Sequence, residues 1–237
     1  MTQRHGKLSA RVGPGGTVLS LIARPLTVPV LRAHADGSLQ LPDLGERIAG
    51  ATRTTLRGKV ENLRGIGALE REVVGGMPYE VENQLTAAGQ AILDVAVAVE
   101  AWLAQAPQGP IALGTGEAKE VILALVGGWS SHILHALAAQ PRSLTALSSA
   151  IDALSYPALE RRLSAMRATR LVEPAVVERR GAKSYALTEW ARGAAIPLLA
   201  AGRCESAHLA EQTISLLTEI DLESIRFLAE PLVELEG

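Results

Sequence analysis

The chain has 237 residues, of which 48% are hydrophobic and 20% are charged, and its formal net charge is −2. This composition excludes a disordered chain and leaves room for two domains of about 100 residues, each with its own core. The single cysteine, Cys204, excludes an intrachain disulfide and a cysteine metal cluster. Since no secretory signal is visible either, we expect a cytoplasmic protein.

Charge is distributed unevenly along the chain. Residues 1–71 contain 11 Lys and Arg against 5 Asp and Glu, whereas residues 206–237 contain one Arg against seven acids. The basic start is compatible with a nucleic-acid-binding surface, and an ordinary solvated surface explains it as well. The uncharged stretch 121–141 is long enough to span a membrane. Because Gly127-Gly128 interrupts it, we expect two short buried helices and no membrane span.

The first half is predicted to be three helices, a hairpin and a long helix. Leu19–Ala35 is apolar at helical spacing, with Pro25 and Pro29 placed to break or bend it. The following elements are a helix over Asp43–Ala49, a helix over Arg53–Ile66 capped by Thr52, strands over Leu69–Val74 and Tyr79–Leu85 around Gly75-Gly76, and a helix from Thr86 to about Gln105. Prolines and glycines after residue 106 indicate a linker.

The second half repeats this plan. Seven residues recur 103 positions later, mostly at apolar positions: Leu31, Ala33, Leu41, Leu44, Ile48, Leu56 and Arg64 return as Leu134, Ala136, Leu144, Leu147, Ile151, Leu159 and Arg167. Leu85-Thr86 returns as Leu187-Thr188 after a slip of one residue. The predicted elements are a helical region over Val121–Ala139, helices over Leu144–Leu154 and Tyr156–Thr169 capped by Ser143 and Ser155, strands over Leu171–Glu178 and Ser184–Leu187, and a helix from Thr188 to about Leu209.

Three helices followed by a hairpin are the plan of a winged helix-turn-helix, whose third helix can enter the DNA major groove. The chain resembles HxlR/MarR-like transcriptional regulators through Leu41-Pro42-Asp43-Leu44, Arg53-Thr54-Thr55-Leu56, Gly67-Ala68-Leu69-Glu70 and Val81-Glu82-Asn83-Gln84-Leu85-Thr86, and in the second half through Ser184-Tyr185-Ala186-Leu187-Thr188. The expected fold is mainly α with small β wings, arranged as two tandem winged helix-turn-helix domains. The predicted divisions are a domain over 1–107, a linker over 108–120, a domain over 121–210 and a packing or dimerisation segment over 211–237.

Candidate DNA-binding residues follow from a helical wheel of each third helix. A groove-reading helix needs small or polar outward residues and cations at its flanks. In the first half these are Thr52, Arg53, Thr54, Thr55, Arg57, Gly58, Lys59, Asn62 and Arg64. In the second half they are Ser155, Tyr156, Arg161 and Arg162, with Arg179, Arg180 and Lys183 in the wing. Gly58 is either a site of close approach to DNA or a tolerated surface residue, and the second helix face is equally compatible with protein packing.

No catalytic or metal-binding constellation is apparent, so we expect no enzyme, no metal and no cofactor. His132 and His135 stand three residues apart without acidic neighbours, a pattern more typical of packing than of a metal site. Trp102, Trp129 and Trp190 are candidate lining for a small-molecule effector site, and core packing explains them as well. The scarcity of aromatic residues, 3% of the chain, favours double-stranded DNA over single-stranded nucleic acid.

The sequence therefore predicts a sequence-specific regulator that binds double-stranded DNA, either as a pseudo-dimer within one chain or as a homodimer. DNA half-sites about one helical turn apart would suit such a pair. The alternative is a non-catalytic tandem winged-helix interaction module, similar to the accessory subunits of chromosome-condensing complexes. The acidic tail favours that alternative, and the basic first 71 residues oppose it.

Overall fold

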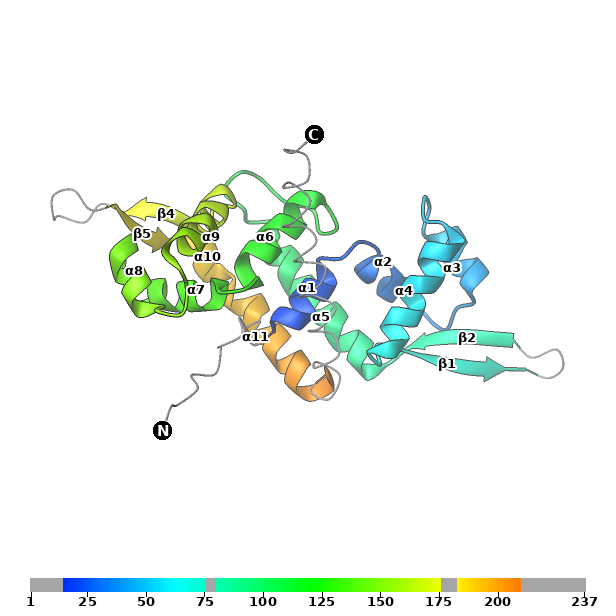
Figure 1. Cartoon of the computed structure of the whole chain (residues 1–237). Helices are drawn as coiled ribbons and strands as arrows, with labels where there is room; N and C mark the ends of the chain where they lie inside the picture. The colour runs from blue at the N-terminus through cyan, green and yellow to red at the C-terminus, as the bar shows by residue number, and fades with distance from the viewer. Residues whose placement is uncertain (1–14, 76–79, 176–182, 210–237) are drawn as a thin grey trace, which may run out of the picture.

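The computed structural model describes residues 15–75, 80–175 and 183–209. The molecule is elongated, with a two-stranded hairpin at one end and a second, smaller sheet at the other (Figure 1). Long helices lie between these ends and join the two halves. The fold is therefore mainly helical with small antiparallel sheets, as expected.

The first half contains six elements before its long helix. They are α1 (Gly16–Ile22), α2 (Thr27–Ala33), α3 (Leu41–Arg47), α4 (Arg53–Gly65), β1 (Leu69–Val74) and β2 (Glu80–Leu85), followed by α5 (Ala87–Leu103). The strands pair in antiparallel register from Leu69 opposite Leu85 to Val74 opposite Glu80. Leu39, just before α3, adds a bridge to Asn83, with both backbone N–H···O bonds 2.9 Å long.

The second half has a similar order of elements. They are α6 (Gly116–Val126), α7 (Ser130–Ala138), β3 (Arg142–Ser143), α8 (Leu144–Ala150), α9 (Tyr156–Ala168), β4 (Val172–Ala175), β5 (Ser184–Leu187), α10 (Glu189–Gly193), α11 (Ala195–Cys204) and the π-helical turn η1 (Glu205–Leu209). The sheet order is β3-β5-β4, and Arg142 pairs with Tyr185. This pairing corresponds in position to the bridge between Leu39 and Asn83.

Equivalent elements start at a constant offset. The helices α7, α8 and α9 and the strand β4 begin 103 residues after α2, α3, α4 and β1, respectively. The residue that follows each third helix by two positions also has the same unusual backbone. Gly67 has φ 73° and Arg170 has φ 59°, although the left-handed region is unfavourable for a residue with a side chain.

The centre of the molecule is built by α1, α5 and α11. The helix α11 packs along α5, and α1 packs against α5, α6 and α11. Gly15 allows the close approach of α1 to α11, since a Cβ there would lie 2.7 Å from the backbone nitrogen of Gly202. Its own N–H donates to Glu205 Oε2 at 2.6 Å. Gly15 thus has a packing role at the centre of the molecule.

Several predicted helix caps are confirmed. The side chains of Thr52, Thr86 and Ser143 each accept a hydrogen bond from the backbone N–H three residues later. Thr188, for which no cap was predicted from the sequence, makes the same bond. The predicted cap at Ser155 is wrong in this respect, because its side chain makes no capping bond. Pro157, in the first turn of α9, suits a helix start without that bond, since proline supplies a helical φ there.

Two predicted breaks in helical regions are confirmed, and one helix that was predicted to be continuous is divided in the structure. The helical region at 19–35 separates into α1 and α2 at Pro25, while Pro29 is tolerated in the first turn of α2. The region at 121–139 separates into α6 and α7 at Gly127-Gly128, and the helix after Thr188 is interrupted at Ala194. The predicted strand to Glu178 is described only as far as Ala175, and the tail after residue 209 lies outside the described residues.

Within the described residues, no individual helix has the length and apolar character needed to cross a membrane. The pair α6 and α7 passes such a test jointly on length and composition, but it is bent by 70°. Most apolar side chains of this pair are buried in the protein core.

Candidate nucleic-acid interface

The third helix of the first half, α4, combines a buried face with an exposed face. Leu56, Val60 and Leu63 are buried on one side and fix the helix against α2, α3 and β1. Thr52 holds the start of the helix, since its Oγ1 accepts from the N–H of Thr55 at 3.2 Å. The rotation of α4 about its axis is therefore set by the core, as the wheel predicted.

The exposed face of α4 carries the charged and small side chains that the sequence selected. Thr52, Arg53, Thr54, Thr55, Arg57, Gly58 and Arg64 are all exposed. No atom lies within 4 Å of a Cβ built on Gly58, so the fold itself does not require glycine there. This face has the composition of a groove-reading helix: cations for phosphates and short polar side chains for base edges.

Two of the predicted DNA-binding residues on α4 are partly buried and lie against neighbouring parts of the protein. Lys59 Nζ donates to Thr27 Oγ1 at 3.3 Å, at the start of α2. Asn62 is half-buried, and its Oδ1 is buried without a hydrogen-bond partner among the described residues. The long, flexible lysine side chain reaches a neighbour that a helical wheel does not represent.

The helix α9 occupies the equivalent position in the second half. Leu159, Leu163 and Met166 form its buried face. Ser155, Tyr156 and Arg161 are exposed, as predicted for residues that contact DNA, and the wing residue Lys183 is exposed too. Arg179 and Arg180 lie outside the described residues.

Arg162 differs from its exposed neighbours. Its guanidinium lies against the break between α6 and α7, where a Cβ on Gly128 would come within 2.9 Å of it. Burial, followed by the nearby charge of Arg161, lowers the pKa of Arg162. Lys59, which stands 103 positions earlier, reaches the start of α2, so the two cations lie at corresponding places in the two halves.

One exposed cation was missed by the sequence prediction. Arg167 is exposed near the end of α9, at the position that corresponds to Arg64 on α4. The signal was present, because this arginine is one of the seven residues that recur at the offset of 103. A helical wheel of α9 alone does not contain this signal.

The two halves are joined by a reciprocal tryptophan pair. Trp102, at the end of α5, donates from Nε1 to the carbonyl of Trp190 at 2.9 Å. Trp190, in α10, donates from Nε1 to the carbonyl of Trp102 at 3.0 Å. The rings stack with centroids 4.7 Å apart and planes 12° apart, and both residues are buried. Two reciprocal hydrogen bonds and a ring stack thus link the halves.

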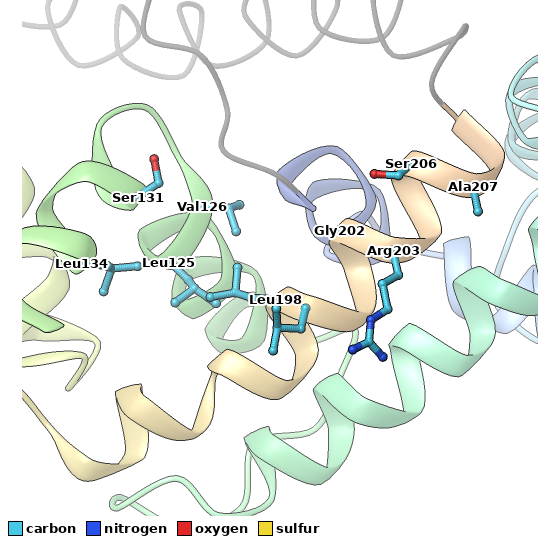
Figure 2. A pocket seen from close by; sticks show the side chains of 10 residues that line it. Leu125, Val126, Ser131, Leu134, Leu198, Gly202, Arg203, Ser206 and Ala207 are labelled. Atoms are coloured by element: carbon cyan, nitrogen blue, oxygen red, sulfur yellow. The ribbon is translucent and has the colours of Figure 1, made fainter.

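A mostly apolar groove of about 700 Å³ lies between α6, α7 and α11. Leu125, Val126 and Leu134 line one side and Leu198 lines the other (Figure 2). Its lining among the described residues contains none of the three tryptophans proposed for an effector site. Trp129 instead lies beside His132, with ring centroids 4.9 Å apart.

Two buried titratable groups lie away from α4. His34 Nδ1 is 2.8 Å from the carbonyl oxygen of Val30, and burial is the main cause that lowers the pKa of His34. Burial, with Glu205 and Asp94 adding negative charge, raises the pKa of Cys204 to about 11. A thiol with this pKa is protonated at neutral pH and is a poor nucleophile.

The first half thus has the fold of a winged helix-turn-helix protein with an exposed cationic third helix. Comparison with protein families agrees: the model of the HxlR-like helix-turn-helix family matches residues 21–108. The matched segment includes α2, α3, α4, the β1-β2 hairpin and α5. No curated protein matches the chain. The family match supports a helix-turn-helix transcriptional regulator that binds double-stranded DNA.

Proposed function

We propose that the protein is a sequence-specific transcriptional regulator in which one chain supplies two winged-helix units to duplex DNA. The observation that carries the proposal is the exposed face of α4, with Arg53, Arg57 and Arg64 beside Thr54 and Gly58. The helix has 13 residues and is about 20 Å long at 1.5 Å per residue. With its side chains a helix is about 10–12 Å across, so α4 can lie in the major groove, which is about 12 Å wide.

The constant offset between the halves supports a second winged-helix unit over α7 to β5. The correspondence includes the third segment that pairs with each hairpin, which is Leu39 in the first half and Arg142 in the second. Such a unit presents α9 as α4 is presented, with its apolar stripe buried and Arg161 and Arg167 exposed.

The tryptophan pair supports pairing of the two units within one chain. At an offset of 102 residues, Trp102 corresponds to Cys204 and Trp190 to Ala88. Two first-half units from separate chains would place Trp102 opposite alanine rather than opposite a second tryptophan. The stack and both indole hydrogen bonds therefore belong to the pairing of a first half with a second half.

A small-molecule effector fits the apolar groove better than it fits the tryptophan pair. The groove volume of about 700 Å³ lies in the usual range for ligand sites. Its lining comes from α6, α7, α11 and η1, so an occupant would contact both the second unit and the helix α11 that packs along α5. We propose an apolar effector at this groove, and a screen for compounds that shift DNA affinity tests it.

The function is tested by fluorescence anisotropy of a labelled random-sequence duplex at several salt concentrations. Replacing both Arg53 and Arg57 by alanine should weaken binding and reduce the magnitude of the salt slope by up to about 2, since each phosphate contact contributes about 0.9. Arg203→Ala is the matched control, because it removes an exposed cation from α11 rather than from α4. Unchanged affinity and slope in the double variant would refute the assigned face. Absence of DNA binding by the wild-type chain would favour the interaction module instead.

A further inference from the structure

The outward residues of α4 and α9 differ at nearly every corresponding position, although their buried residues agree. Leu56, Val60 and Leu63 correspond to Leu159, Leu163 and Met166, all of them buried and apolar. The outward pairs are Arg53 and Tyr156, Thr54 and Pro157, Arg57 and Glu160, Gly58 and Arg161, Glu61 and Ser164, and Arg64 and Arg167. Among these exposed pairs, only Arg64 and Arg167 are the same type of residue.

These differences change what each helix can recognise. Arg57 can donate two hydrogen bonds to a guanine edge, whereas Glu160 at the corresponding position accepts from cytosine and repels phosphate. Gly58 leaves the surface of α4 flat, whereas Arg161 projects a long cation from α9. Pro157 has no side-chain donor or acceptor where Thr54 has a hydroxyl. The two surfaces are therefore complementary to different base sequences.

We infer that the protein binds a non-palindromic site with two different half-sites, occupied by one chain. The inference rests on the proposed function. A palindromic operator mirrors the two-fold symmetry of a homodimer, in which both reading helices are identical. Here the two halves are joined through Trp102 and Trp190 within one chain, and their reading helices are not identical.

The experiment selects bound sequences from a random duplex pool with the full chain, and measures the mass of the protein–DNA complex by light scattering. The expected result is two unlike half-motifs and one chain per duplex. Replacing either half-motif by the inverted copy of the other should lower affinity at least about tenfold, because the exchange introduces several mismatched base pairs and each lowers affinity by about fivefold or more.

A variant chain makes the inference sharper. The outward residues of α9 are replaced by those of α4: Tyr156→Arg, Pro157→Thr, Glu160→Arg, Arg161→Gly and Ser164→Glu. All five positions are exposed, so the buried stripe of α9 is unchanged. This variant should select a more symmetric site, in which the half-motif read by α4 is repeated in inverted orientation. Circular dichroism and thermal unfolding verify that the variant is folded.

The outcomes separate the inference from the proposed function. If the wild-type chain selects a palindrome bound by two chains, the inference is overturned while DNA-binding regulation stands. The inference is also overturned if the wild-type chain selects a site with a single half-motif and the α9 variant selects the same site. If the pool yields no enriched sequence at all, the proposed function fails first.

Discussion

The tryptophan pair predicts a measurable coupling between the two halves. Replacing Trp102 or Trp190 by leucine removes one indole donor and also ends the ring stack. A hydrogen bond of this kind contributes about 1 kcal/mol, and a stacked aromatic pair about 0.5–1.5 kcal/mol beyond its buried area. With the smaller volume of leucine, each single variant should lose about 2–4 kcal/mol of unfolding free energy. That is a large part of the usual stability of a domain, about 5–15 kcal/mol.

The double variant is the informative measurement. The stack is already lost in either single variant, so its contribution cannot be lost twice. The double variant should therefore be more stable than additivity predicts, by about 1 kcal/mol. The assay is guanidinium denaturation followed by far-ultraviolet circular dichroism, which does not depend on tryptophan fluorescence. Trp129→Leu combined with Trp190→Leu is the control pair and should be additive, because Trp129 contacts His132 rather than Trp190. A coupling energy of zero for Trp102 and Trp190 would refute the reasoning.

Three further predictions concern single residues. Gly58→Ala should stabilise the protein by up to about 1 kcal/mol, since the site is exposed and helical. Gly89→Ala should destabilise the protein, because the new Cβ would lie 2.2 Å from the carbonyl oxygen of Ala68. Thermal unfolding that gives both variants the same change in stability would contradict this prediction. Burial lowers the pKa of His34 in the folded protein from 6.5, so as the pH falls this imidazole is protonated in the unfolded chain before it is protonated in the folded one. The contribution of His34 to the free energy of unfolding should therefore be fully present above pH 6.5 and decline below it. Denaturation at pH 7.5 and 5.5 should show this decline, and His34→Gln should reduce it. Alkylation of Cys204 at pH 8 should be far slower in the native than in the unfolded protein, because a pKa of about 11 leaves about one thiol in a thousand ionised. Equal alkylation rates in the two states would contradict the burial of Cys204.

Local signals in the sequence predicted the elements around the candidate interface well. Thr52 marks the start of α4, and the spacing of Leu56, Val60 and Leu63 sets its buried face. These features depend on residues within one or two helical turns, so sequence reasoning can reach them. The exposed position of Arg53 and Arg57 follows directly from the same stripe.

Features that depend on distant neighbours could not be predicted in this way. The strand β3 exists because Arg142 and Ser143 pair with β5, more than 40 residues further along the chain. The side chain of Lys59 is directed by Thr27 on another helix. The stack of Trp102 on Trp190 depends on how helices from the two halves pack, so the sequence alone left both an effector site and core packing open for these tryptophans.

In a chain that contains two units, the two reading helices can differ in sequence, whereas in a homodimer they are identical. In a homodimer, a substitution on the reading helix alters both half-sites at once, and a substitution at the interface appears on both sides. On the duplication proposed here, Arg57 and Glu160 could diverge while the buried stripes of both helices stayed apolar, because folding constrains each stripe and recognition constrains each surface separately. The interface shows the same independence, since tryptophans stand at 102 and 190 while Ala88 and Cys204 occupy the corresponding positions. On the proposed function, unlike reading surfaces and an unsymmetrical joint are two consequences of one covalent connection, and together they predict a regulator that distinguishes the two ends of its site.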